Sequence, residues 1–237
     1  MEEITDSLWH VRGADFRLPG GGRLPLYSSL VRLADGALLL HAPASFDDAT
    51  WRRIAERGEV AHVVAPNLYH HLFVAAALER WPRATLHGPA ALAAKRTDLA
   101  ATLRPLDGDA SPWPGDLDTI ALRGAPALDE VVLFHRASGG LLCGDLLFNV
   151  TEPANLATRL VLAVMGTSGG RPAQSRAWRF LVRDRAAMRT ALEQLLALPV
   201  KCVLPCHGSS VAIGAQALAP LLARAWGGAP PVPAAVN

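Results

Sequence analysis

The sequence predicts one α/β (α+β) domain in which a hairpin-rich first half is followed by alternating strands and helices. The chain has 237 residues, 51% hydrophobic and 19% charged, a composition that suits one large folded domain. The strongest short hairpin signal, Asp35-Gly36, separates two apolar runs. After it, β-rich runs alternate with amphipathic stretches. We expect this domain to cover residues 1–227 and the Pro- and Ala-rich residues 228–237 to form a disordered tail.

The first half supplies the hairpin and the first alternating elements. Apolar runs rich in β-branched residues indicate the strands, and capping residues, glycines and prolines indicate where helices begin and end. In chain order we expect strands at 4–11, 26–33 and 37–40, a helix at 46–54, a strand at 60–65, a helix reaching 81, a strand at 83–87, a helix at 90–99 and a loop at 103–114.

The second half contains strands, a long helix and one segment without a clear pattern. In chain order we expect strands at 118–122, 130–136 and 140–142, a helix at 179–198, a strand at 200–204, a turn at 206–208 and a last helix at 216–226. Between 149 and 178, several glycines and Pro172 interrupt any periodicity, so we expect an irregular segment there. In an enzyme, such a segment would act as a lid or specificity loop.

Composition and charge narrow the classes of partner. The formal net charge of +2 is no strong basic excess, and the arginines between 171 and 189 are spaced like solvated helix faces, so we expect no nucleic-acid partner. No segment approaches the ~20 apolar residues of a membrane span, so we expect no membrane partner. The acidic start lacks the order of a secretion signal, and three cysteines form no disulfide framework. We therefore expect a cytoplasmic protein with a small-molecule substrate.

Metal-binding and catalytic residue types recur where the predicted strands end. His41 ends one strand, His70 and His71 follow a second, Asp145 follows a third and His207 follows a fourth. Sites of α/β proteins gather beyond the carboxyl ends of strands, where loops converge. Imidazole and carboxylate groups suit zinc or ferrous iron. Two or three histidines with one aspartate would hold one ion and leave a coordination position open for water.

Each of these residues also has a purely structural interpretation. Asn67 is a good helix N-cap, and His70 lies three positions later at the same helix start. Adjacent helix positions point ~100° apart, so we do not expect both histidines to face one ion. We expect His71 to be the metal ligand. We expect His70 to contact a metal ligand or the substrate. Asp145 and His207 could be ordinary turn residues.

The motifs resemble those of the metallo-β-lactamase fold over about residues 2–226. The similar stretches are Ile-Thr-Asp-Ser-Leu-Trp-His-Val at 4–11, Ala-Asp-Gly-Ala-Leu-Leu-Leu-His at 34–41, Gly-Asp-Leu-Leu-Phe at 144–148 and Cys-His-Gly at 206–208. In the family the aspartate of Gly-Asp-x-x-Phe bridges two metals. The resemblance implies an αββα sandwich, with two mixed β-sheets packed together and helices on their outer faces.

The main metal-binding motif of that family is degenerate here. Its His-x-His-x-Asp-His falls on residues 66–71, where only His71 remains and His70 replaces the aspartate. Glu130 stands near the place of a further lost histidine. The chain is most similar to an uncharacterised branch of the superfamily, a domain of unknown function, through its sequences at 41–43, 65–73 and 144–149, with Lys95, Trp113 and Glu130.

The resemblance implies a reduced, single-metal site. Its expected metal ligands are His71, Asp145 and His207, with His70 in place of the lost aspartate, and its expected catalytic residues are His70, Glu130 and Asp145. One zinc or iron ion would then serve a metal-dependent hydrolase. The alternative is a non-catalytic binding or regulatory protein that kept the fold and lost the metal.

Overall fold

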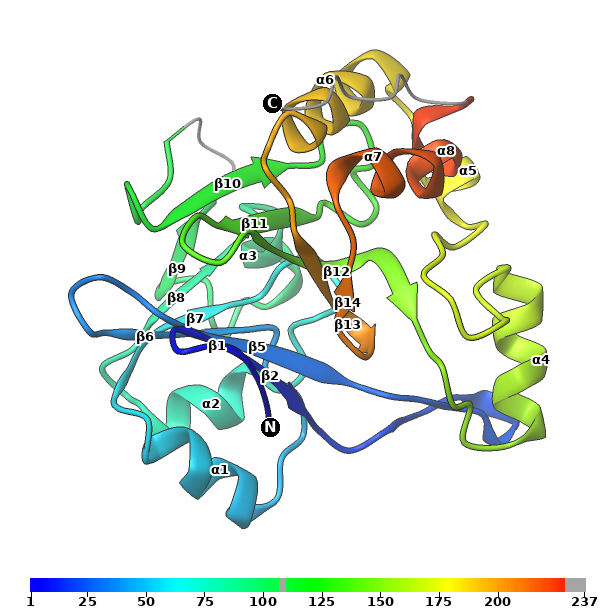
Figure 1. The fold of residues 1–237 in the computed structure, drawn as a ribbon. Helices are drawn as coiled ribbons and strands as arrows, with labels where there is room; N and C mark the ends of the chain where they lie inside the picture. Colours follow the sequence, from blue (N-terminus) through cyan, green and yellow to red (C-terminus); the bar gives the residue numbers. More distant parts are fainter. Residues whose placement is uncertain (107–109, 229–237) are drawn as a thin grey trace.

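Two β-sheets pack face to face, and helices cover their outer faces, in the arrangement αββα (Figure 1). The computed structural model describes residues 1–106 and 110–228. Of the expected tail at 228–237, all residues after Gly228 lie outside the described residues. Within the described residues, no helix is both long and apolar enough to span a membrane.

The first sheet is mixed and has seven strands. Their order is β1 (Glu2–Thr5), β2 (Leu8–Arg12), β5 (Tyr27–Arg32), β6 (Leu38–His41), β7 (Val60–Val64), β8 (Thr85–Gly88) and β9 (Leu103–Pro105). Pairing is antiparallel from β1 to β6 and parallel from β6 to β9. The expected hairpin around Asp35-Gly36 is confirmed as β5 and β6. The carboxyl ends of β6 and β7 therefore lie at the same edge of this sheet, as the sequence predicts.

The second sheet is also mixed and has five strands. Their order is β10 (Leu117–Ala121), β11 (Val131–His135), β12 (Gly140–Asn149), β13 (Cys202–Gly208) and β14 (Val211–Ala212). Only β12 and β13 pair in parallel. A separate two-stranded hairpin, β3 (Phe16–Arg17) and β4 (Arg23–Leu24), follows the first sheet's second strand and encloses the short 3₁₀ helix η1 (Pro19–Gly21).

The core has three layers because side chains alternate between the two faces of each strand. On β5, Leu30 packs outward beneath the helices, and Val31 packs inward against the other sheet. The layer between the sheets is apolar and contains Leu8, Val31, Leu39, Val64, Leu117, Val131, Leu133, Leu142 and Leu204. Burial of these leucines and valines stabilises the sandwich by about 1.5–3 kcal/mol for each side chain.

The helices divide between the two outer faces. Those on the first sheet are α1 (Asp48–Ala55), α2 (Val74–Arg80) and α3 (Leu92–Lys95), and those on the second are α5 (Trp178–Leu181), α6 (Arg185–Leu196), α7 (Ala215–Leu218), η2 (Ala219–Leu222) and α8 (Ala223–Trp226). Helix α4 (Leu156–Met165) lies apart, at the right of Figure 1, and packs on the β3–β4 hairpin.

Several sequence predictions are wrong in detail. The expected strand at 4–11 is the β1–β2 hairpin, and the expected helix at 179–198 is interrupted because Asp184 caps the start of α6. Residues 149–178 contain α4, which has Asn155 as its N-cap and Gly166 after its last turn. His207 belongs to β13 rather than to a turn. Local capping decided the helix boundaries, and the pairing of β12 with β13 extended both strands.

The break before α6 predicts a measurable capping energy. Asp184 Oδ1 accepts a hydrogen bond from the backbone N–H of Ala187 at 3.0 Å. We expect Asp184→Ala to lower the free energy of unfolding by about 1 kcal/mol, measured by urea denaturation. Asp184→Asn keeps an N-cap acceptor and should stay close to the unmodified protein. Equal losses in the two variants would contradict the assignment of the cap.

Candidate metal centre

Asn67 sets the path of the chain after β7. Its Oδ1 accepts hydrogen bonds from the backbone N–H groups of Tyr69 and His70, at 2.9 and 2.8 Å. The segment that follows forms turns, and helix α2 begins only at Val74. The capping role expected for Asn67 is therefore present, but it caps a turn. His70 and His71 do not lie on a regular helix.

Glu130 organises an irregularity in β12. The register of β12 against β13 shifts between Cys143 and Phe148, which leaves backbone groups of β12 without strand partners. The Glu130 carboxylate accepts hydrogen bonds from the backbone N–H groups of Gly144 (2.8 Å), Asp145 (2.9 Å) and Leu146 (3.2 Å). We call Gly144–Leu146 the β12 bulge. Its geometry presents the side chain of Asp145 to the edge where the two sheets meet.

Residue 144 lies so close to the side chain of Asn67 that a glycine, which has no Cβ, suits this position. A Cβ at residue 144 would lie 2.6 Å from Nδ2 of Asn67. That amide group donates a hydrogen bond to Oδ2 of Asp145 at 2.9 Å. Asn67 thus connects the turn that carries His70 with the bulge that carries Asp145. Trp178 holds the same bulge from the other side, because its indole N–H donates to the carbonyl of Asp145 at 3.0 Å.

His207 is oriented by a backbone carbonyl. Its Nδ1 lies 3.2 Å from the carbonyl oxygen of Pro25, and because that oxygen only accepts, Nδ1 carries the proton. In the neutral imidazole, Nε2 then has the free lone pair. The ring stacks on Phe148, with centroids 4.8 Å apart and an interplanar angle of 13°. The lone pair is thereby directed toward Asp145.

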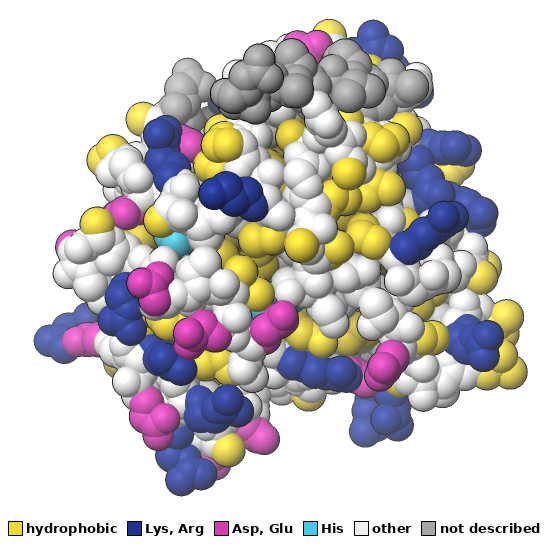
Figure 2. Space-filling model, in the orientation of Figure 1, with side chains coloured by type: hydrophobic (Ala, Val, Ile, Leu, Met, Phe, Trp, Pro, Cys, Tyr) yellow, Lys and Arg dark blue, Asp and Glu magenta, His cyan; other side chains and the backbone are white. Residues whose placement is uncertain are grey.

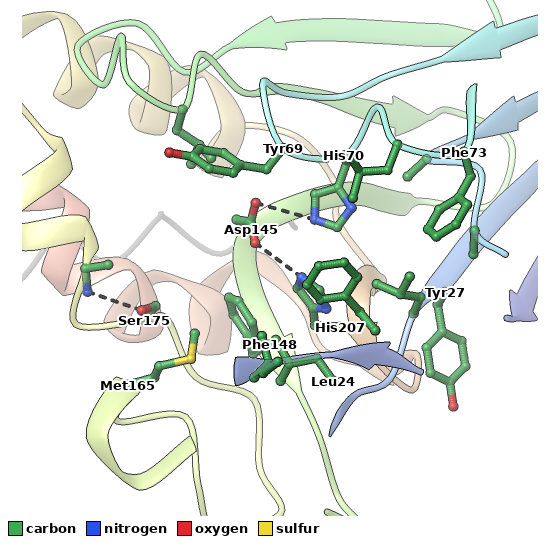
Figure 3. Close-up of a pocket in the computed structure, with 18 of the residues that line it drawn as sticks. Leu24, Tyr27, Tyr69, His70, Phe73, Asp145, Phe148, Met165, Ser175 and His207 are labelled. Carbon is green, nitrogen blue, oxygen red and sulfur yellow. Dashed lines mark hydrogen bonds and ion pairs between the residues drawn. The ribbon is translucent and has the colours of Figure 1, made fainter. Parts of the chain in front are cut away.

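His70, Asp145 and His207 converge on one point (Figure 3). One ligand atom from each residue lies within 4.8 Å of the other two. Nε2 of His207 is 3.4 Å from Oδ1 of Asp145, and Nε2 of His70 is 3.4 Å from Oδ2. The three side chains come from β13, the β12 bulge and the Asn67 turn. Among the described residues, this is the one group of three or more such ligands that could hold a metal ion.

The electrostatics of the group keep Asp145 ionised. Burial opposes the charge on Asp145, but the imidazoles of His70 and His207 outweigh it and hold the pKa of Asp145 below its ordinary value. Burial, together with the charge on Asp145, raises the pKa of Glu130 above its ordinary value, against the opposing effect of the three backbone N–H groups. The negative charge that faces the group is therefore that of Asp145.

The donor set fits a divalent cation. Metal–ligand bonds of about 2.0–2.2 Å in a tetrahedron place neighbouring ligand atoms about 3.4 Å apart. Nε2 of His207 has this separation from Oδ1 of Asp145, and Nε2 of His70 has it from the other carboxylate oxygen, Oδ2. A protonated Nδ1 on a carbonyl oxygen, as in His207, is also the usual support of a metal-binding histidine. Two imidazoles and one carboxylate suit zinc or iron, and this geometry does not distinguish the two.

His71 and Glu130 do not join this group. Nδ1 of His71 lies 3.1 Å from a guanidinium nitrogen of Arg96, which also donates to the carbonyl of His71. The structure brings His70 to Asp145 in place of the expected principal ligand His71, because the turn at Asn67 directs His70 there. Glu130 is 1% exposed, and its carboxylate binds the backbone of the bulge, including the N–H of Asp145, so it positions Asp145. It is neither a ligand nor in contact with the cavity described below.

Two further buried residues, Trp178 and His41, lie near the site, and the sequence pattern indicated His41 but not Trp178. Trp178, expected outside any regular segment, is the partner of the Asp145 carbonyl. His41 is fully buried, and neither of its ring nitrogens has a hydrogen-bond partner among the described residues. Burial, followed by the charges of His70 and His10, lowers the pKa of His41 to about 3, so this ring is neutral. The sequence pattern indicated His41 because this residue ends a strand, β6.

A family model covers most of this architecture. Residues 23–169 match the model described as a domain of unknown function, DUF4336. The chain belongs to this family. The match includes the Asn67 turn, Glu130 and the β12 bulge, and His207 lies beyond it. A search of curated proteins gave no match.

Solved structures of metallo-β-lactamases are similar to this DUF4336 member along most of its length. DIM-1 metallo-β-lactamase has 13% sequence identity and a TM-score of 0.63, with 96% of this chain and 94% of that chain covered. The enzyme from Pontibacter korlensis has 17% identity and a TM-score of 0.60, with 95% of each chain covered. FIM-1 from Pseudomonas aeruginosa, in a mono-zinc form, has 15% identity and a TM-score of 0.57, with 89% and 88% covered. At such identities the similarity shows the metallo-β-lactamase fold alone.

The contacts of Glu130 predict a graded loss of stability. Glu130→Ala leaves three buried N–H groups without an acceptor, so we expect the free energy of unfolding to fall by roughly 3 kcal/mol or more. Glu130→Gln keeps one acceptor oxygen, which can still serve Gly144 and Leu146, and should lose less. Chemical denaturation of both variants measures the difference. A Glu130→Ala protein as stable as the unmodified one would contradict the role of this carboxylate.

Proposed function

We propose that this protein is a metal-dependent hydrolase with a single-ion site formed by His70, Asp145 and His207. The observation that carries the proposal is the matched separation of 3.4 Å between each imidazole Nε2 and the Asp145 carboxylate. With each Nε2 unprotonated, two lone pairs face the carboxylate at this distance, and a cation between the three groups would stabilise them. One of the similar structures is a mono-zinc form, which supports the use of this fold with one ion.

The site also opens into a cavity that can hold a substrate. Its volume is about 400 Å³, within the ~300–1,000 Å³ usual for small-molecule sites. His70, Asp145 and His207 all line it. Three protein ligands leave a coordination position for water or substrate, which is the arrangement of catalytic rather than structural zinc sites.

In hydrolysis, the bound ion and the residues around it would have separate roles. A bound ion would supply Lewis-acid activation of water and of the scissile group. Asn67 donates to Oδ2 of Asp145 and so fixes the orientation of this carboxylate. Pro25 keeps the proton of His207 on Nδ1, away from the centre.

Metal content tests the proposal directly, and the adjacent histidines give a matched comparison. We expect elemental analysis of untagged protein to find one zinc or iron ion per chain. His70→Ala, Asp145→Asn and His207→Ala should each lower the metal affinity by roughly 100-fold. His71→Ala should retain the ion, because its ring contacts Arg96. Hydrolysis of para-nitrophenyl acetate should stop on chelation and return when the metal is restored.

Two results would contradict the proposal and favour a non-catalytic binding or regulatory protein. One is protein that takes up no stoichiometric zinc or iron at micromolar concentrations. The other is bound metal whose removal leaves every measured hydrolytic activity unchanged. Equal metal loss in His70→Ala and His71→Ala would instead show that the ligand set is assigned incorrectly.

A further inference from the structure

We propose that the substrate is an uncharged, apolar carboxylic ester or lactone with a medium-length acyl chain. This proposal rests on the proposed hydrolase function and concerns the same cavity. The reaction breaks the acyl C–O bond: the oxygen of water bonds to the acyl carbon, and one proton of water passes to the leaving alkoxide. An ester gives a carboxylic acid and an alcohol, a lactone gives one hydroxy acid, and no redox partner or further reactant is needed.

The cavity groups its ionisable side chains together, and most of the rest of its wall is apolar. His70, Asp145 and His207 lie together within the cavity, as Figure 3 shows. Most of the remaining lining is apolar and comes from six different parts of the chain, represented by Leu24, Phe73, Leu128, Phe148, Met165 and Trp178. A substrate that fills this cavity therefore places its reactive bond beside His70, Asp145 and His207 and an apolar group along the wall.

Charge decides which kinds of substrate fit. Among the described residues that line the cavity, Asp145 is the one acidic side chain and none is Lys or Arg. A substrate phosphate, sulfate or carboxylate beyond the reach of the ion would be desolvated without a cationic partner, at a cost of several kcal/mol. Ester and lactone groups can be hydrolysed and carry no charge. The lining therefore favours them over phosphoesters and nucleic acids.

The basic side chain of Lys95, which approaches a residue of the cavity lining, is already engaged. Nζ of Lys95 donates to the carbonyl of Leu68 and lies 4.5 Å from the ring centroid of Tyr69, a residue of the cavity lining. The Tyr69 ring thus presents one face to the ammonium group. Lys95 contributes no cation to the lining, and the rim at Tyr69 is aromatic.

The apolar character continues from the cavity onto helix α4. Met165, the last residue of α4, lines the cavity, while Leu156, Leu160 and Val164 on the same helix are 69%, 60% and 75% exposed. Their spacing of four residues places these three on one face of the helix. Figure 2 shows hydrophobic side chains at the surface on the side where α4 lies. Leu156, Leu160 and Val164 themselves do not line the cavity.

A chain-length series tests the substrate class. With metal-loaded protein and para-nitrophenyl esters from acetate to decanoate, we expect kcat/KM to rise up to about fourfold per added methylene until the cavity is filled. Para-nitrophenyl phosphate and bis(para-nitrophenyl) phosphate should not be hydrolysed. Met165→Lys should remove the preference for long chains by placing an ammonium group in the wall. Val164→Lys, one residue earlier and solvent-facing, should leave the series unchanged.

Binding of 1-octanol separates the two proposals. Calorimetry should show that 1-octanol binds the unmodified and His207→Ala proteins alike, and binds Met165→Lys at least tenfold more weakly. Octanol binding without hydrolysis of any ester would support the apolar ligand class and contradict the hydrolase. Hydrolysis of phosphoesters alone, or a flat chain-length series, would support a hydrolase and overturn the substrate class. Absence of both octanol binding and ester hydrolysis would also overturn it.

Discussion

The candidate site depends on one buried carboxylate, that of Glu130, which replaces strand pairing at the point where β12 departs from β13. Three consecutive backbone N–H groups would otherwise be buried without acceptors, at about 1–3 kcal/mol each. With them satisfied, the bulge is stable and directs Asp145 to the edge of the sandwich. The geometry of the metal group therefore follows from a contact that does not itself belong to the group.

Asn67 extends this constraint to the first sheet. Its amide oxygen holds the turn of His70, and its amide nitrogen donates to Asp145, so one side chain fixes two ligands that come from different sheets. His207 is fixed separately, through Pro25 and Phe148. Each ligand is thus oriented before any ion binds, which is what a preorganised metal site requires.

The fold could be predicted from the sequence because its signals are local and recur along the chain. The Asp35-Gly36 hairpin, the β-run at 60–64 and the Gly-Asp motif at 144–145 all lie where the structure has the corresponding elements. Asp145 and His207 could be placed at strand ends for the same reason. The sequence contained further signals for α4, since Asn155 and Gly166 bound an apolar run, but the glycines around this run obscured them.

The choice between His70 and His71 could not be made from periodicity. The two rings point differently whether the chain forms a helix or a turn, and only the hydrogen bonds of Asn67 Oδ1 decide which one faces Asp145. The role of Glu130 was hidden for a similar reason. Its partners are backbone amides, which every residue type except proline supplies, so the residue types at 144–146 do not indicate this contact. The acidic side chain therefore resembled a metal ligand or a general base.

Because Glu130 binds only backbone N–H groups of the β12 bulge, the backbone path of the bulge does not depend on the side chain at position 145. Every amino acid except proline supplies the backbone amide that this carboxylate binds, so the path of the chain places no demand on the side chain at position 145. A thiolate or a third imidazole could replace that carboxylate on the same backbone and alter metal preference without rebuilding the scaffold. Position 144, where only glycine fits against Asn67, has no such freedom.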